Sequence, residues 1–197
     1  MESGGLCAYS DTGNTGGAVR DNELIRLFLP VINADLIERE FLDVTVKQSN
    51  QPPIQGANSG STVYFYKLFD KRFGWVRKNS EWDADSEAMV HTEMQMYETT
   101  FQISAMVRQN PLNTSKYTAS DLINEVASIM QSDSTIRTFA NSDVGVLRIT
   151  DIQNPYFKDD YENFEAFASF DFTLTHRQTR VTVEPVVQSV ELKLYRV

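Results

Sequence analysis

The run MQMYETTFQISAMVR, residues 94–108, decides the fold because apolar and polar side chains alternate along it. One side would carry Tyr97, Thr99, Phe101, Ile103, Ala105 and Val107, and the other Glu98, Thr100, Gln102, Ser104 and Arg108, with Met106 as the exception. Alternation with a period of two is typical of a β-strand with one buried and one solvated face. The run is well beyond the ordinary strand length of about 5–6 residues. It therefore predicts an unusually long strand.

Other strands are predicted on both sides of this run. Residues 164–177 form a second long alternating segment, with Phe164, Ala166, Ala168, Phe170, Phe172 and Leu174 on one face. Shorter segments rich in β-branched and aromatic residues lie at 43–48, 62–69 and 144–152. We expect a turn followed by a continuation at 70–75, and polar loops at 49–61, 79–88 and 153–163.

Two helices are predicted. The first is capped by Asp21 or Asn22 and ends or kinks near Leu29, because Pro30 interrupts its apolar pattern; residues 35–41 would resume it. The second covers about 119–131, behind a capping box formed by Thr118 and Asp121. Together with the strands, these helices predict an α+β fold in which helices flank an antiparallel or mixed sheet.

The chain divides into a central domain and two arms. The glycine-rich residues 1–20 predict a flexible N-terminal arm, residues 21–180 the α+β domain, and residues 181–197 a C-terminal extension or edge strand. No phosphate-binding loop is predicted in the N-terminal arm, because its glycines are not followed by the Lys-Ser/Thr pair of that motif.

Composition limits the classes of function. The 197 residues include 18 basic and 27 acidic ones, for a net charge of −9. This charge disfavours a duplex-binding surface, yet suits a wall along which DNA slides without sticking. A single cysteine excludes an internal disulfide, and no run approaches the roughly 18 apolar residues of a membrane span. We expect a protein that folds in the cytosol, with no membrane partner.

No motif predicts a catalytic centre, a cofactor site or a metal site. His91 and His176 have no ligand partners at metal-binding spacing, so both are interpreted as surface or strand-end residues. Cys7 has no activating base nearby. The acidic run that begins at Asp83 resembles a calcium loop but lacks the glycine and the final glutamate of that motif. The acidic cluster Asp159, Asp160, Glu162 and Glu165 is interpreted as a charged loop tip.

The order of the elements resembles the phage tail and neck terminator proteins over residues 21–180. The resemblance rests on the opening helix 22–29, on Gln51-Pro52-Pro53 before the strand 62–67, and on the strand 94–108 with its Asn110-Pro111 turn and the capped helix that follows. It implies a virion protein assembled in the host cytoplasm. Its copies would form a ring, expected to be hexameric, at the head-proximal end of the tail, with DNA passing through the lumen.

The resemblance also implies partners: the tail tube protein, the head-completion or connector protein and, as a further candidate, the tail sheath. The predicted contact residues lie in or beside the loops: Gln51, Pro52, Pro53, Ile54, Phe73, Trp75, Trp82, Tyr156, Phe157 and Tyr161. These aromatic side chains fit core packing as well as an interface. Two alternatives stay open, another head–tail joining, tube-related or sheath-associated protein, and an enzyme acting on carbohydrate through Asp159, Asp160 and Glu162.

Overall fold

The computed structural model describes residues 21–49, 60–107, 115–158 and 164–185. Their elements in chain order are α1 (Asp21–Glu38), β1 (Val44–Gln48), β2 (Ser61–Asp83), β3 (Ala88–Met106), α2 (Ala119–Met130), α3 (Asp133–Ala140), β4 (Val144–Ile149), β5 (Tyr156–Lys158) and β6 (Phe164–Pro185). The predicted arms at 1–20 and beyond 185 lie outside the described residues, and the predicted division into domains stays a prediction.

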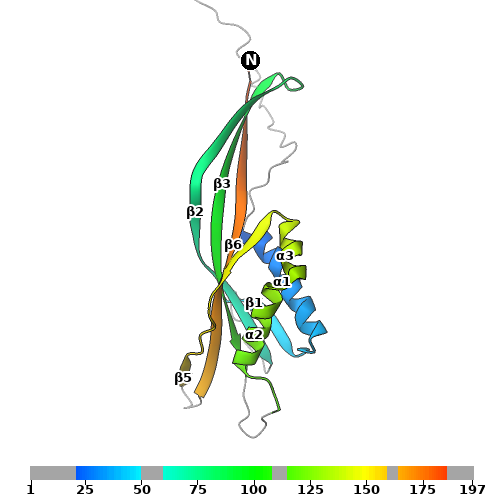
Figure 1. The fold of residues 1–197 in the computed structure, drawn as a ribbon, viewed down its shortest axis with the longest axis vertical. Helices are drawn as coiled ribbons and strands as arrows, with labels where there is room; N and C mark the ends of the chain where they lie inside the picture. Colours follow the sequence, from blue (N-terminus) through cyan, green and yellow to red (C-terminus); the bar gives the residue numbers. More distant parts are fainter. Residues whose placement is uncertain (1–20, 50–59, 108–114, 159–163, 186–197) are drawn as a thin grey trace, which may run out of the picture.

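One six-stranded mixed sheet, in the order β1-β2-β3-β6-β4 with β5 on the side of β6, organises these elements. β1 pairs with β2 in parallel, and every other pair is antiparallel. The three helices cover one part of the sheet (Figure 1). The predicted α+β class is confirmed.

β3 lies in the middle of the sheet, as expected of the sequence's longest alternating run. The side chains of Thr99, Phe101, Ile103, Ala105 and Val107 are buried, which confirms the predicted buried face. The opposite face is less solvated than predicted, since Thr100 and Ser104 are also buried. β3 begins at Ala88, before the predicted start at Met94, because its early residues pair along their whole length with β2 and β6.

The core lies between this sheet and the helices. In α1 the buried residues are Leu24, Phe28, Ile32 and Leu36, spaced four apart so that they form one stripe. The ring of Phe28 lies 5.2 Å from those of Phe65 and Phe101 and 5.4 Å from that of Phe172, all edge-on. α2 begins at its predicted capping box, in which Thr118 and Asp121 hydrogen-bond reciprocally.

The helix does not end near Leu29, one of the two predicted outcomes, because α1 continues through Pro30 to Glu38. Pro30 is exposed, on the side opposite the buried stripe. The carbonyl that loses its hydrogen bond can therefore bind water, while the packing of Phe28 and Ile32 holds the helix together on both sides of the proline.

The predicted turn at 70–75 is wrong, although the chain continues beyond it as expected, and the predicted polar connection at 79–88 is shorter than expected. β2 runs without interruption to Asp83, and the reversal falls at residues 84–87. In place of the turn there is a bulge between Phe73 and Arg77, where Gly74 has a φ of +71° and the Gln95 side-chain amide donates to the Phe73 carbonyl at 2.8 Å. A bulge accepts the glycine without ending the pairing of the strands.

The remaining differences concern strand ends. β6 does not stop at Arg177 but continues to Pro185, so residues 181–185 belong to it. β4 ends at Ile149, before the predicted 152, and Tyr156–Lys158 form β5 inside the predicted loop. The sequence did not predict α3, which begins at the N-cap Ser132 and buries Phe139.

The strands β2, β3 and β6 are longer than the part of the sheet that the helices cover (Figure 1). In Figure 1, β2, β3 and β6 continue together beyond the helical layer as a slender ribbon that ends in the β2–β3 hairpin. We name this ribbon the β-arm: residues 69–83 of β2, 88–98 of β3 and 177–185 of β6.

Candidate interaction site: the β-arm and its base

The β-arm exposes most of the large apolar side chains that the described residues leave in solvent. Trp75 is 98% exposed, beside the bulge. The other exposed apolar residues of the β-arm are Phe69, Phe73, Val76, Trp82, Met96, Val181 and Val183. Contiguous apolar exposure of this kind marks an interaction site more often than an ordinary surface.

Strand register places many of these residues on one face. Phe73 lies beside Met96, which lies beside Arg177; nearer the hairpin, Val90 lies beside Val183. These β3 positions are even-numbered, whereas the odd-numbered Phe101 and Ile103 face the helices, so this is the face of the ribbon opposite to the helices. We name it the outer face. The other face is mostly polar, with Ser80 hydrogen-bonded to His91 at 2.8 Å, but it also carries Trp82 beside Met89 near the hairpin.

Charge is distributed unevenly along the β-arm. Its middle contains six basic residues: Lys71, Arg72, Arg77, Lys78, Arg177 and Arg180. The same part of the β-arm contains two acidic residues, Glu93 and Glu98. Lys78 lies 3.0 Å from Glu93, and Lys71 lies 3.3 Å from Glu98. The tip carries Glu81, Asp83, Asp85, Glu87 and Glu184. The β-arm therefore has a basic middle and an acidic tip.

The tip is ordered by Asp83. Its carboxylate accepts hydrogen bonds from the Ser86 hydroxyl at 2.6 Å and from the Asp85 backbone N–H at 3.1 Å, and the Ser86 hydrogen bond lowers the pKa of Asp83. The run resembling a calcium loop is thus a hairpin turn. Within the described ranges, no three His, Cys, Asp or Glu residues are placed to bind a metal ion.

A chain of polar contacts crosses the sheet at the base of the β-arm. The Lys67 ammonium donates to Asp70 at 2.5 Å and to Asp21, at the start of α1, at 2.7 Å. Asp70 also accepts from the Thr99 hydroxyl at 2.7 Å, and Thr99 contacts His176 Nε2 at 2.9 Å. The contacts join α1, β2, β3 and β6 where the helical layer ends.

The pKa values follow from burial and these contacts. Burial opposes charge on both Lys67 and Asp70, but their mutual hydrogen bond, with those of Asp21 and Thr99, leaves the pKa of Lys67 raised and that of Asp70 lowered. Burial lowers the pKa of His176, against the raising effect of Asp70 and Asp21. His176 is 3% exposed, so the expectation of a surface or strand-end residue is wrong.

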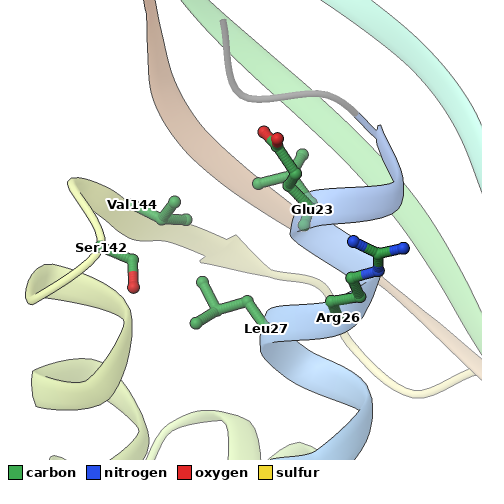
Figure 2. A pocket seen from close by; sticks show the side chains of 6 residues that line it. Glu23, Arg26, Leu27, Ser142 and Val144 are labelled. Atoms are coloured by element: carbon green, nitrogen blue, oxygen red, sulfur yellow. The ribbon is translucent and has the colours of Figure 1, made fainter. Parts of the chain in front are cut away.

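A shallow cavity lies between α1 and the start of β4. Its volume is about 360 Å³, and Glu23, Leu24, Arg26, Leu27, Ser142 and Val144 line it. Figure 2 shows it between the first turns of α1 and the chain entering β4, with Leu27 reaching toward Ser142. The lining can seat a small apolar side chain, and it offers no group of convergent acids or bases.

The structure brings together only some of the predicted contact residues. Phe73, Trp75 and Trp82 lie on the β-arm, in strand β2 rather than in loops. Tyr156 and Phe157 lie in β5, toward the opposite end of the molecule (Figure 1). Gln51, Pro52, Pro53, Ile54 and Tyr161 fall outside the described residues, as do Asp159, Asp160 and Glu162.

Sequence reasoning missed the contributions of β3 and β6 to the exposed surface. Met96 was assigned to neither face of the long strand, and Val181 and Val183 were assigned to a separate extension. The alternation of Val181 and Val183 with Thr182 and Glu184 was the available signal, because it continues the period of β6.

Residues 23–186 match the family of the E217 gateway protein gp29. The chain belongs to the E217 gateway protein gp29 family. The match extends from the first turn of α1 past the end of β6, so it includes the β-arm. This is a phage head–tail gateway, or neck, family, which identifies the chain as a phage neck or tail-joining protein. No curated protein sequence matches the chain.

Membership of this family tests the expected kind of protein and its expected place in the virion. It confirms the expected kind of protein, a structural component of the head–tail junction of a virion, without specifying a terminator. None of the helices in the described part of the chain has the length and apolar character needed to cross a membrane.

Proposed function

We propose that this gateway-family protein forms a ring, expected to be hexameric, that terminates the head-proximal end of the tail and joins it to the head connector. The observation that carries the proposal is the β-arm, an amphipathic ribbon with Phe73, Trp75 and Met96 in solvent. In a protein that functions alone such a ribbon would be an aggregation hazard, whereas in an assembly it is a ready contact surface.

A closed ring needs two different surfaces that meet by rotation. The chain has two pairs of unlike surfaces that could meet in this way. The sheet has β1 at one edge and β4 at the other, and the β-arm has β2 at one edge and β6 at the other. The tail tube protein and the head-completion protein would lie above and below the ring, with the tail sheath as a further neighbour. The net charge of −9 suits a lumen through which DNA passes without being held.

The role is structural rather than catalytic in this proposal. Membership of a head–tail gateway family supports it. The carboxylates of the carbohydrate-active alternative, Asp159, Asp160 and Glu162, lie outside the described residues. Another head–tail joining, tube-related or sheath-associated role is the remaining candidate. The position of the protein in the particle distinguishes these roles.

The decisive experiment disrupts the gene in the phage that carries it and examines the lysate by negative-stain electron microscopy. We expect filled heads and complete tails that are not joined, and joined virions when the wild-type protein is supplied from a plasmid. Joined, infectious particles in the absence of the protein would refute the proposal.

A second experiment measures the assembly itself. Light scattering after size exclusion, with imaging of the same fraction, should reveal rings close to six subunits, either alone or after tail tubes are added. A protein that stays monomeric and also ignores tail tubes would contradict a ring-forming terminator.

A further inference from the structure

We propose that the β-arm of one copy packs against the β-arm of the next copy, with its acidic tip on the neighbour's basic middle. The inference deepens the proposed ring and rests on it, because it names the surface through which neighbouring copies recognise one another. The occupant of the exposed β-arm is thus a second copy of this chain.

Charge complementarity is the first argument. The tip groups Asp85 and Glu87 make no ion pair among the described residues, and neither does Arg77 in the middle of the β-arm. Unpaired charges of opposite sign on one ribbon attract the matching region of another copy and fix its register. A partner with a uniform charge would meet repulsion at either the tip or the middle.

The exposed apolar surface is the second argument. The outer face presents Phe73 and Met96 in the middle of the β-arm, and Val181 and Val183 nearer its tip. A contact that places tip on middle therefore brings apolar side chains of both copies together between the charged regions. Buried apolar contacts of this kind supply affinity, while charged groups at the rim supply orientation.

The geometry determines the kind of contact. The tip pair Asp83–Ala88 lies six positions beyond the pair Arg77–Met94, or roughly 20 Å at about 3.4 Å per residue. Neighbouring β-arms must therefore be shifted along their length, which in a ring requires that they tilt from the ring axis. When each copy gives its tip to one neighbour and its middle to the other, the contact is head-to-tail and can close by rotation.

The edges of the β-arm argue for packing by faces instead of added strand pairing. The β2 edge is interrupted by the bulge at Gly74 and carries Lys71, Arg72, Arg77 and Lys78. Bulges and charged side chains are the usual means by which an edge strand avoids pairing with another chain. The outer face carries charged side chains too, but it also exposes Phe73 and Met96, which can pack against another copy.

Charge exchange tests the contact. Arg77→Glu alone and Asp85→Lys alone should each weaken self-association at least tenfold, measured by analytical ultracentrifugation of the full chain. The double variant Arg77→Glu/Asp85→Lys restores opposite charges between neighbours and should recover association to within about threefold of wild type. Arg137→Glu, an exposed reversal on α3 away from the β-arm, is the matched control and should leave association unchanged. Single reversals without effect, or a double variant no better than its parents, would overturn the proposal.

Cross-linking tests the register. In a Cys7→Ser background, which removes the single cysteine, a Val76→Cys protein is mixed with a Ser86→Cys protein and treated with a bis-maleimide about 10 Å long. Each protein carries one cysteine, so every cross-link joins two chains. The two positions are roughly 25–30 Å apart along one β-arm, so the reagent can join them only if neighbouring β-arms are shifted along their length. The mixture should yield more cross-linked dimer than either protein alone. If each protein alone yields cross-linked dimer and the mixture yields no more, the tip-to-middle register is wrong.

If something other than a neighbouring copy covers the β-arm, the association measurements should differ. If deletion of residues 186–197 makes a monomeric chain associate, the β-arm is covered by its own C-terminal segment and the inference is wrong. Binding of duplex DNA that Arg77→Glu abolishes, with self-association unchanged, would assign the basic middle to nucleic acid instead. A closed dimer that never grows would refute the head-to-tail contact.

The inference and the proposed function can fail separately. If plasmid-borne wild-type protein joins heads to tails, and both charge reversals do so equally well, the function stands and the contact is wrong. If the wild-type protein makes no difference to joining, the function itself is wrong, whatever the β-arms do.

Discussion

His176 Nε2 lies 2.9 Å from Thr99 Oγ1, across the β6–β3 pair at the base of the β-arm. The Thr99 hydroxyl has one proton, and it donates that proton to Asp70 at 2.7 Å. His176 must therefore donate from Nε2, so in the neutral ring Nδ1 carries no proton. In the described part of the chain Nδ1 is buried and has no hydrogen-bond partner. The neutral imidazole thus completes a chain of contacts that ends at Lys67 and Asp21.

The first prediction concerns pH. The pKa of His176 is lowered from 6.5, mainly by burial, so between about pH 6.5 and that lower value the unfolded chain binds more protons than the folded one. The free energy of unfolding should therefore fall on acidification through this window. The lowered pKa of Asp70 has its effect only near and below pH ~4. Urea unfolding at about pH 7.5 and pH 5.5 should show the loss.

His176→Gln is the matched variant for this prediction, since its amide can still donate to Thr99 but does not titrate. We expect the difference in stability between the two pH values to shrink in this variant. Equal pH dependence in both proteins would mean that other groups cause it.

The second prediction concerns the ion pairs at the same place. Lys67→Met removes the cation shared by Asp21 and Asp70, and should lower the free energy of unfolding by about 1 kcal/mol, because the three groups are only partly screened by solvent. Lys71→Met is the control: its side chain is 63% exposed and its single ion pair, with Glu98, should matter by less than about 0.5 kcal/mol. Similar losses in both variants would contradict a special role for Lys67.

The third prediction concerns the core. Phe28 is fully buried and its ring contacts those of Phe65, Phe101 and Phe172, so Phe28→Ala should cost about 3–5 kcal/mol by loss of burial and by cavity formation. Ile37→Ala, at an exposed position of the same helix, should change stability by less than about 0.5 kcal/mol. Chemical denaturation measures both. A cost below about 2 kcal/mol for Phe28→Ala would mean that α1 does not pack here.

The fourth prediction concerns Pro30. Pro30→Ala restores a backbone donor in the middle of α1 at an exposed site, and should raise the free energy of unfolding by roughly 1–3 kcal/mol. The reverse change at a nearby exposed position, Ala34→Pro, should cost about 3 kcal/mol or more. Thermal unfolding by circular dichroism can measure both changes. A loss of stability in Pro30→Ala would show that the helix depends on its proline.

Local patterns predicted much of the helical half of the molecule. The alternation in 94–108 assigned Phe101 and Ile103 to the buried face, and the reciprocal hydrogen bonds of Thr118 and Asp121 were expected from their spacing. The aromatic residues Phe73, Trp75 and Trp82 were predicted as contact residues, and the structure leaves all three exposed. Their role in an interface stays a prediction.

The β2 part of the β-arm is the part that local patterns could not predict. Residues 70–83 are charged and contain Gly74, so they lack the apolar alternation of a strand packed on a core. Their strand character comes from hydrogen bonds to β3, which are non-local. Likewise, nothing adjacent in the chain indicates that His176 is buried beside Thr99 and Tyr97.

By itself the sequence determined the buried face of β3 and the start of α2, because each depends on side chains at short, regular spacing. Only the tertiary structure decided that α1 continues through Pro30, that β2 and β6 extend to the tip of the β-arm, and that one ribbon has a basic middle and an acidic tip. Those features arise from contacts between distant segments, in which packing and backbone pairing outweigh local preference.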